Sequence, residues 1–546
     1  MRRIAPSLLA LSLALAAPLS PAQDTALPDF GSSANELITP AQQEQYGEML
    51  LAQLHHYGYV LEDPLLQEWL DTLGARLAAA SDRPRQDFTF FLLRDRDINA
   101  FATLGGYVGV NAGLVLAADR EDQVASVLSH EIAHVTQDHV LRAVERAQRD
   151  QIPILLGMLA AVAAASASNS DSSGDAAQAA IVSAMGLAQQ RQINYTRSNE
   201  SEADRIGIQT LARSGYDTRG MAEFFEKMLV ASRSNRGSDP LYQVPDYLMT
   251  HPVTTTRIAE ARDRAARLKA ESGAGAVCVR DPDGLDECRR EGTGAPRFVA
   301  PGTSNPLLPA GLKLDGPPSG GTGLFDFARE RMRVLSADTP RAALTEYERL
   351  AAAKPLTPAQ RYGQALARLR ANRAEAAADE LAALLAQHPG VSWIALALAE
   401  AEAKAGRAQV ADARFEALMR AAPTNLAIAL TYAGVLNERG TAEGGRRAQA
   451  VLRPLMAGAG RDVVFQRTLA RASELAGDAI RAGEAYAEAA YLGGRPELAL
   501  LQLNNLKKRE DLDYYARARI EARIAAITPT VLELRRQGVR DADVRR

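Results

Sequence analysis

The sequence His-Glu-Ile-Ala-His at positions 130–134 constrains this chain more than any other feature. Residues four positions apart share one face of an α-helix, so the pattern predicts a helix that aims two imidazoles at one point. Two such imidazoles can bind one Zn²⁺ ion, and Glu131 then lies beside a water molecule on that ion. Apolar residues recur every three or four positions here, so we expect this helix to start within 119–122 and to bury one side. The geometry suits hydrolysis better than a structural zinc site, and accidental spacing on an exposed helix is the alternative.

Length and composition set broad limits on the fold. The chain has 546 residues, enough for more than one domain with its own core. Its hydrophobic fraction of 47% and charged fraction of 24% are typical of globular proteins, and its net charge of -3 gives no electrostatic reason to expect a nucleic-acid partner. Aromatic residues make up only 5% and alanine is abundant, which favours closely packed helices over sheet sandwiches.

The N-terminus has the pattern of a secretory signal. Arg2 and Arg3 precede an apolar run over 4–17, and small residues stand at both cleavage-determining positions of Ser20-Pro21-Ala22. We therefore predict cleavage after Ala22 and a soluble exported protein. The run is shorter than the roughly 20 residues that span a bilayer, so we expect peripheral membrane contact at most. An oxidising compartment also favours a disulfide between Cys278 and Cys288 over two free thiols.

Local patterns predict further elements before the motif. Thr39-Pro40 and Asp63-Pro64 each combine a capping side chain with a first-turn proline, which indicates the start of a helix. The β-rich segments 88–92 and 107–110 predict a small sheet just before the motif helix. An exposed edge strand there would let an extended substrate pair its backbone with the protein, whereas an ordinary core hairpin fits the sequence equally well.

Two segments after the motif invite different interpretations. The apolar segment 152–165 is too short to span a bilayer, so we expect a core helix or a helix that lies on a surface. The Ser-, Asn- and Asp-rich segment 166–175 predicts a loop that could act as a lid.

His139 lies nine residues after His130, about half a turn round a continuous helix. We therefore expect it to bond to nearby backbone or to support the site without binding the metal.

A catalytic zinc ion needs a third protein ligand, and the acidic segment 199–205 can supply it. Glu200 and Asp204 are four residues apart and share one helix face, whereas Glu202 points in roughly the opposite direction. Glu200 could therefore bind the metal while Asp204 orients a ligating histidine. Spacing alone leaves Glu200 and Glu202 as alternatives, because either could face inward, and a solvated acidic face is the common alternative to both.

Taken together, these blocks resemble the M48 family of metalloproteases. The resemblance rests on three stretches: HEIAH at 130–134, ESEADRIG at 200–207, and Thr250-His251-Pro252 followed by Arg257. An Asn-Ala-Phe-Ala run at 99–102 with glycines at 105 and 106 belongs to the same pattern. Leu104 departs from the family, which commonly has proline before the glycine pair.

The family resemblance implies a role for each residue that matches. It selects Glu200 over Glu202 as the third ligand, so that one Zn²⁺ per chain is held by His130, His134 and Glu200. It implies that Asp204 supports a ligand and that Glu131 acts as the general base. It places His251 over the metal, where this residue would stabilise the oxyanion or occupy the open coordination position at rest.

A second pattern governs the C-terminal part, after a linker rich in glycine and proline over 289–323. Residues of one kind recur there every 34 positions: Pro355, Pro389 and Pro423; Asn372, Gly406 and Gly440; Ala365, Ala399 and Ala433. Small residues at helix crossings, glycine-type turns and terminating prolines resemble tetratricopeptide repeats. Such repeats would stack into an α-solenoid with a concave binding face, and a generic alanine-rich bundle is the alternative.

The fold class that follows is mainly α: an α+β zincin-like metalloprotease domain with a small sheet, followed by an all-α solenoid. The expected divisions are a signal peptide (1–22), a metalloprotease domain (23–288), a linker (289–323), a solenoid (324–526) and a charged tail (527–546).

The resemblance to exported M48-like proteases with such repeats implies that this chain acts in the periplasm on outer-membrane β-barrel proteins. The resemblance thus implies two partners, stalled or misfolded barrels and the barrel assembly machinery, with contact through the solenoid face. A chaperone or adaptor with a dormant or occluded zinc site is the alternative function.

Overall fold

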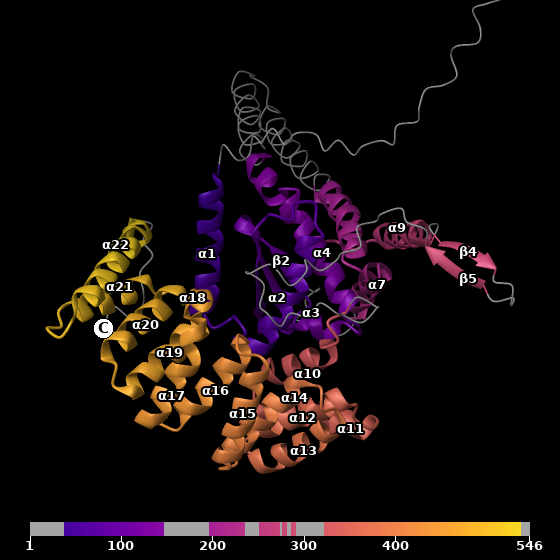
Figure 1. The fold of residues 1–546 in the computed structure, drawn as a ribbon. Helices are drawn as coiled ribbons and strands as arrows, with labels where there is room; N and C mark the ends of the chain where they lie inside the picture. The colour runs from indigo at the N-terminus through magenta and orange to yellow at the C-terminus, as the bar shows by residue number, and fades with distance from the viewer. Residues whose placement is uncertain are drawn as a thin grey trace, which may run out of the picture.

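The computed structural model describes residues 38–146, 196–234, 251–273, 276–280, 286–290 and 321–536 (Figure 1). These residues form a mainly α protein with one small three-stranded sheet, as predicted. The predictions for the signal peptide, for 152–165, for the 166–175 loop and for most of the linker lie outside the described residues. Within the described part of the chain, no helix is both long and apolar enough to cross a membrane.

The elements of the N-terminal part follow the expected order. They are α1 (Pro40–His56), α2 (Pro64–Ala79), β1 (Thr89–Leu93), β2 (Ala100–Ala102), β3 (Tyr107–Asn111), α3 (Ala112–Ala117), α4 (Glu121–Thr136), helices over 139–146 and 196–213, α7 (Arg219–Ser234) and α9 (Thr255–Gly273). Both helix starts are confirmed. Thr39 forms a capping box with Gln42, and the Asp63 side chain accepts from the Leu66 amide.

The sheet has the strand order β1-β3-β2, which contradicts the core hairpin. β1 and β3 are parallel, and the short strand β2 pairs antiparallel with β3. β2 was not expected as a strand, and it forms an edge beside α4. Gly105 and Gly106 make the turn between β2 and β3 with φ of 76° and 79°, a region that glycine adopts without steric cost.

Helix α4, which carries the motif, is more deeply buried than its pattern indicated. We expected one buried side, yet fifteen of its sixteen residues are buried. It has this environment because α2, α7 and the sheet pack around it. The acidic Glu121 and Asp122 stand in its first turn, where negative charge is favourable to the helix dipole. The motif is therefore held in the centre of the N-terminal part, on an element that has little freedom to move.

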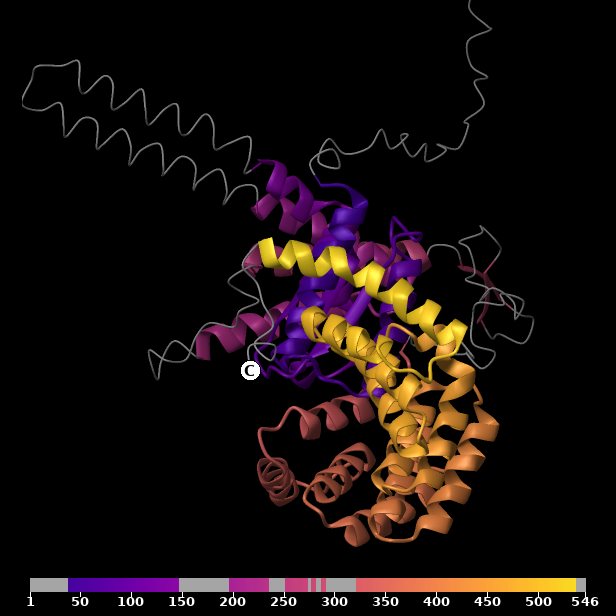
Figure 2. The ribbon, with the colours of Figure 1, turned by 90° about the vertical axis from the view of Figure 1, so that its left-hand side faces the viewer.

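Past the linker, the described part of the chain over 324–536 forms helices joined by short turns. Its α-helices are α10 (Phe325–Leu335), α11 (Pro340–Ala353), α12 (Pro358–Arg370), α13 (Ala374–Gln387), α14 (Ser392–Lys404), α15 (Ala408–Ala421), α16 (Leu426–Glu438), α17 (Ala442–Leu452), α18 (Met456–Ala459), α19 (Val463–Ala476), α20 (Ala479–Leu492), α21 (Pro496–Lys507) and α22 (Tyr514–Arg536). Consecutive helices pack on one another, so that they form an α-solenoid (Figures 1 and 2).

The 34-residue pattern is confirmed at the level of the backbone. Asn372, Gly406 and Gly440 stand in the turns inside three successive helix pairs, and all have positive φ, at 59°, 80° and 66°. The alanines at 365, 399 and 433 are fully buried, because each lies where helices pack closely. The end of the solenoid differs from our expectation: α22 continues to Arg536, ten residues into the segment we assigned to a charged tail.

The solenoid curves round one end of the N-terminal part and contacts it through buried groups (Figures 1 and 2). Arg331 of α10 donates to both carboxylate oxygens of Asp63, at 2.7 and 2.6 Å. The Thr322 amide and hydroxyl both donate to Glu121, in the first turn of α4. The Asp63 carboxylate thus caps α2 and binds the solenoid, and the Glu121 carboxylate joins the end of the linker to the motif helix.

The two cysteines lie opposite each other in a separate two-stranded ribbon. β4 (Ala276–Arg280) pairs antiparallel with β5 (Asp286–Arg290), in a register that sets Cys278 against Cys288. The disulfide stays a prediction. The expected domain boundary after 288 falls inside β5, so the ribbon as a whole comes before the linker.

Candidate metal centre

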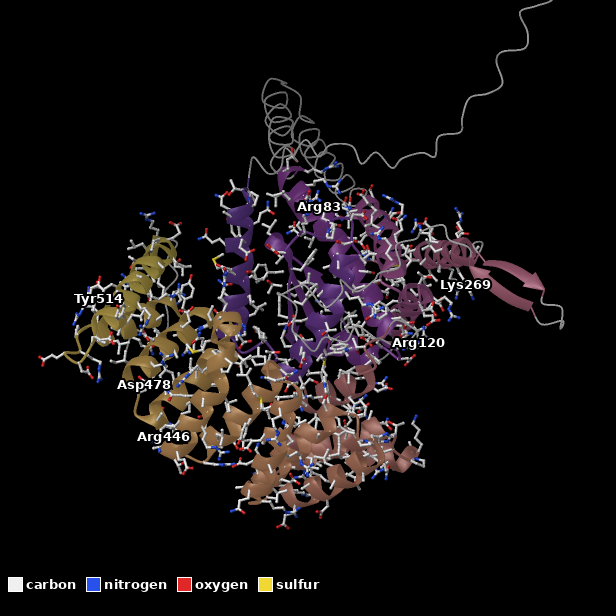
Figure 3. All side chains as sticks on the ribbon, in the orientation of Figure 1. Arg83, Arg120, Lys269, Arg446, Asp478 and Tyr514 are labelled. Carbon is white, nitrogen blue, oxygen red and sulfur yellow. The ribbon has the colours of Figure 1, made fainter. Side chains whose placement is uncertain are left out.

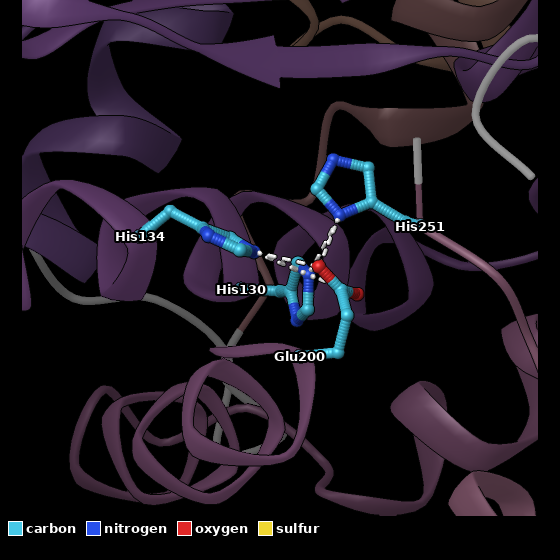
Figure 4. A group of neighbouring side chains, drawn as sticks. All are labelled: His130, His134, Glu200 and His251. Atoms are coloured by element: carbon cyan, nitrogen blue, oxygen red, sulfur yellow. Dashed lines mark hydrogen bonds and ion pairs between the residues drawn. The ribbon is translucent and has the colours of Figure 1, made fainter. Parts of the chain in front are cut away.

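Four potential ligands meet between α4, the helix over 196–213 and the start of the segment leading to α9 (Figure 4). They are His130, His134, Glu200 and His251, and one atom from each lies within 4.8 Å of the others. The first three are buried and His251 is half-buried. The structure therefore brings together all three predicted metal ligands and sets His251 against them.

The spacing of these atoms fits a single zinc ion. Two ligand atoms that share a tetrahedral zinc ion lie about 3.3 Å apart, because each Zn–N bond is about 2.0 Å long. The His130 and His134 Nε2 atoms are separated by 3.0 Å, and they lie 3.5 and 3.4 Å from the two Glu200 carboxylate oxygens. His251 Nδ1 lies 3.4 Å from His130 Nε2 and 2.9 Å from Glu200. The donor set of three imidazoles and one carboxylate is also one that zinc prefers.

Asp204 lies behind His130, as the helix spacing predicted. Its Oδ1 is 3.0 Å from His130 Nδ1, so the carboxylate can hold the ring with its Nε2 atom directed at the other ligands. Arg257 donates to both oxygens of Asp204 at 2.7 Å and also lies 2.8 Å from Glu200. The sequence indicated Arg257 only as part of a family pattern, and its position between two buried carboxylates requires the tertiary structure.

Glu131 occupies the place expected of a general base. Its side chain is almost fully buried beside the ligand cluster, and Oε1 has no hydrogen-bond partner among the described residues. His251 Nε2 lies 3.9 Å from the same oxygen, and the backbone of Ala102 on the edge strand β2 also bonds to Glu131. Burial raises the pKa of Glu131, although nearby His251 and His130 oppose this effect. A proton acceptor, an edge strand and a metal site therefore adjoin one another.

His139 is outside the ligand cluster, but not for the reason expected. α4 stops at Thr136, and Asp138 adopts a left-handed φ of 54°, so His139 does not continue the same helix. Arg83, labelled in Figure 3, donates to both Asp138 oxygens and holds this turn. The break turns His139 back toward the site, where its Nδ1 lies 2.9 Å from His134 Nδ1.

Glu202, the rejected alternative to Glu200, also has a defined place. Its Oε2 lies 3.1 Å from His139 Nε2 and accepts from Arg142 at the same distance. The two glutamates therefore face different partners from the same helix, because they are two residues apart. The alternative of a solvated acidic face does not describe this part of the helix, because Glu200 and Asp204 are buried and Glu202 is paired with His139 and Arg142.

Gly207 allows the two helices of the site to approach. A Cβ atom here would lie 3.1 Å from the backbone of His130, closer than most real contacts of this kind. Gly207 lies seven residues after Glu200, or about two helical turns, so it shares the face that carries Glu200 and Asp204. The sequence contains this glycine at the end of ESEADRIG, but spacing alone did not indicate its function.

The electrostatics of the site keep its two principal ligands in different states before metal binds. Burial lowers the pKa of His134 to about 3. Burial also opposes protonation of His130, but hydrogen bonds to Asp204 and Glu200 outweigh this effect and raise its pKa to about 10. Burial alone would raise the pKa of Glu200, yet hydrogen bonds from the three histidines hold it far below its usual range. These shifts favour the ionised carboxylate of Glu200 and the protonated imidazole of His130 in the metal-free cluster.

Comparison with known proteins agrees with this geometry. Residues 64–265 match the model of peptidase family M48. The chain therefore contains a peptidase domain of family M48. The matched range holds the HEIAH motif, Glu200, Asp204, His251 and Arg257.

Several relatives share a name. The chain is 42% identical over 259 residues to a putative beta-barrel assembly-enhancing protease of Vibrio cholerae, covering 47% of this chain and 51% of that protein. It is 36% identical over 266 residues to the beta-barrel assembly-enhancing protease of Escherichia coli K12, covering 49% and 52%. The corresponding protein of Yersinia pestis is 34% identical over 375 residues, covering 69% and 66%. The chain thus spans about half the length of the first two relatives.

Family membership and geometry agree on the metal. Proteases of family M48 use zinc, and the His130, His134, Glu200 and His251 cluster can hold one ion. The structure brings every predicted site residue into one place. The individual roles of Glu131, Asp204 and His251 in a reaction stay predictions.

Proposed function

We propose that this chain is a zinc metalloendopeptidase. The observation that carries the proposal is the convergence of His130, His134 and Glu200 on one point with Glu131 buried beside it. A zinc ion bound there supplies Lewis acidity, which activates a water molecule and polarises the scissile carbonyl. Three protein ligands leave a coordination position for this chemistry, as catalytic zinc sites require.

The protein groups divide the remaining work. One carboxylate oxygen of Glu131 accepts a proton from the attacking water. Glu131 then donates this proton to the nitrogen of the leaving amine. Asp204 and Arg257 hold the ring of His130 and the carboxylate of Glu200 in place, so these two ligands lose little conformational entropy when zinc binds. His251, which lies 3.9 Å from Glu131, can donate to the carbonyl oxygen as negative charge develops there.

The edge strand offers a way to bind an extended substrate. Among the described residues β2 pairs only with β3, on one side, and its Ala102 backbone bonds to Glu131. A peptide that adds to the other side of β2 through backbone hydrogen bonds would run beside the base, with little demand on its sequence. This mode of binding suits a protease that degrades unfolded segments.

The biological role is proposed from the relatives. Their names describe proteases that enhance β-barrel assembly, and the chain has a signal-like N-terminus in its sequence. We therefore place it in the periplasm, after cleavage near Ala22, where it would degrade stalled outer-membrane β-barrel proteins and assist the assembly of others. The solenoid would contact these barrels or the assembly machinery through its concave face.

One observation favours a second candidate, a chaperone or adaptor with an occluded zinc site. His251 Nδ1 lies inside the ligand cluster, 2.9 Å from Glu200, where it could fill the coordination position that water needs. In that state the solenoid would perform the main task. The two candidates differ in whether hydrolysis is needed for the role in assembly.

The decisive variant is Glu131→Gln, which removes the base and keeps the shape of the side chain. We expect it to retain one zinc ion per chain and to cleave an unfolded barrel protein about 10²–10⁴-fold more slowly than the wild type. Glu226→Gln is the matched control, because Glu226 is a half-exposed glutamate on α7 that pairs with Arg262 at the surface. Cleavage by Glu131→Gln at the wild-type rate would refute the assigned base.

Complementation separates the two candidates. Cells without the protein would receive either the wild type or Glu131→Gln, and barrel assembly in the outer membrane would be measured. Full rescue by a variant that does not hydrolyse substrate would favour the chaperone or adaptor. Failure to rescue, with normal folding and zinc content, would favour the protease.

A further inference from the structure

The inference concerns how His134 is held, and it rests on the proposed zinc peptidase function. His130 has a carboxylate, Asp204, directly behind it. His134 has another histidine in this position: His139 Nδ1 lies 2.9 Å from His134 Nδ1, and the two ring centroids are 4.7 Å apart with planes at 76°. The carboxylate of Glu202 lies one step further back, 3.1 Å from His139 Nε2.

The hydrogen-bond directions in this chain follow from the donors and acceptors present. An ionised carboxylate can only accept, so the bond to Glu202 requires a proton on His139 Nε2. A neutral imidazole carries one N–H, which leaves His139 Nδ1 as an acceptor. The short contact between the two Nδ1 atoms then requires the proton to be on His134. His134 Nε2 is therefore left with a free lone pair, and this is the atom that faces the other ligands.

The backbone is arranged for this contact. If α4 continued past Thr136, His139 would point to a different side of the helix. The turn at Asp138 and the bidentate bond from Arg83 instead redirect the chain, so that His139 returns to His134. His139 itself is buried, with an exposed fraction of 3%, and Arg142 holds Glu202 from the solvent side.

We propose that His139 is a positioning residue that fixes the tautomer and ring orientation of His134 for zinc. Glu202 in turn holds His139, and we call this series of hydrogen bonds from His134 through His139 to Glu202 the relay. Each ligating histidine is thus tied to a carboxylate, His130 directly and His134 through one intervening imidazole. Supporting groups of this kind contribute about 10–100-fold to metal affinity.

Two substitutions at one position test the relay. The side-chain amide of asparagine can take the place of His139 Nδ1, whereas that of glutamine reaches the place of Nε2. His139→Asn therefore keeps the contact with His134, and His139→Gln keeps only the contact with Glu202. Zinc affinity would be measured by competition with a chelator, and the ligand geometry by the visible spectrum of the Co²⁺-substituted full-length protein.

We expect His139→Asn to bind zinc within about threefold of the wild type, and His139→Gln to bind it about 10–100-fold more weakly with an altered Co²⁺ spectrum. Equal weakening by both variants, or wild-type affinity for His139→Gln, would overturn the proposal. His388→Gln, which removes a histidine from the solenoid, is the control for incidental metal binding.

A third variant keeps the test decisive if the buried substitutions impair folding. Glu202 is 32% exposed, so Glu202→Ala is tolerable for packing. It should weaken zinc binding in the same direction, and Glu202→Ala combined with His139→Gln should be no worse than His139→Gln alone, because both act on one chain of bonds. Wild-type affinity for Glu202→Ala, or fully additive losses, would count against the relay. Failure of the wild type itself to bind zinc would instead refute the proposed function.

Discussion

Replacing Arg257 with methionine removes a cation from between two buried carboxylates. The Arg257 side chain has an exposed fraction of only 9%, and it donates to Asp204 at 2.7 Å twice, to the Pro252 carbonyl at 2.9 Å, and approaches Glu200 at 2.8 Å. Removal of one partner from a buried charge network typically costs about 3–5 kcal/mol, because the remaining charge stays desolvated. We expect Arg257→Met to lower the free energy of unfolding of the metal-free protein by that amount.

Zinc affinity should change in the same variant. Without Arg257, no other side chain among the described residues is known to pair with the Asp204 carboxylate on the side away from His130, so we expect zinc to bind about 10–100-fold more weakly. Arg257→Lys keeps the charge but lacks the planar fork that serves two carboxylates, and it should lose roughly half of the stability that Arg257→Met loses. Urea unfolding of the metal-free protein and chelator competition measure the two effects.

A matched control lies on the same helix. Arg267 pairs with Asp263 at the surface of α9 and is 73% exposed, so Arg267→Met should cost less than about 1 kcal/mol. The reasoning fails if Arg257→Met unfolds within about 1 kcal/mol of the wild type and binds zinc equally tightly. It also fails if Arg267→Met is as destabilising as Arg257→Met.

Three other predictions address the interface, the electrostatics and a turn. Asp63→Asn keeps the helix cap but loses the ion pair with buried Arg331, so it should lower the free energy of unfolding by about 3–5 kcal/mol. Asp63→Ala also loses the cap and should lower it by about 1 kcal/mol more; denaturant unfolding measures both changes. Because the pKa of His130 is raised to about 10, zinc binding at pH 7 should release at least one proton and strengthen as pH rises; calorimetry in two buffers that shows no release would contradict this. Gly106→Ala places Cβ 2.2 Å from a backbone oxygen and should cost well over 2 kcal/mol, whereas Gly58→Ala, with a similar φ of 71° but open space, should cost about 1 kcal/mol in thermal unfolding.

The helical framework could be predicted because its signals are local. Thr39 and Asp63 cap their helices through bonds to residues three positions away, so the sequence alone contains both partners. The 34-residue period set the turns at Gly406 and Gly440, because a positive φ is a property of one residue and its neighbours. The pairing of strands could not be predicted in this way: β1 and β3 are parallel, and this depends on how the chain between them crosses the sheet.

The metal ligands could likewise be predicted from the sequence, but the residues that hold these ligands in place could not. His130 and His134 share a helix face by geometry alone, and a family resemblance was enough to choose Glu200 over Glu202. The bonds of Arg257 to Asp204 span 53 residues, and no periodicity relates the two positions. Contacts of this length form only when separate helices pack.

The sequence by itself therefore determined the motif helix, its two imidazoles and the repeating helix pairs, since each depends on angles fixed within a few residues. Tertiary structure decided the burial of α4 on nearly all sides, the edge strand β2 beside Glu131 and the seating of the solenoid on Asp63. It also decided the role of His139. A continuous helix would direct this ring away, and the break at Asp138, which depends on Arg83 from 55 residues earlier, brings it back to His134. Local geometry specified the ligands, and long-range packing specified what holds them in place.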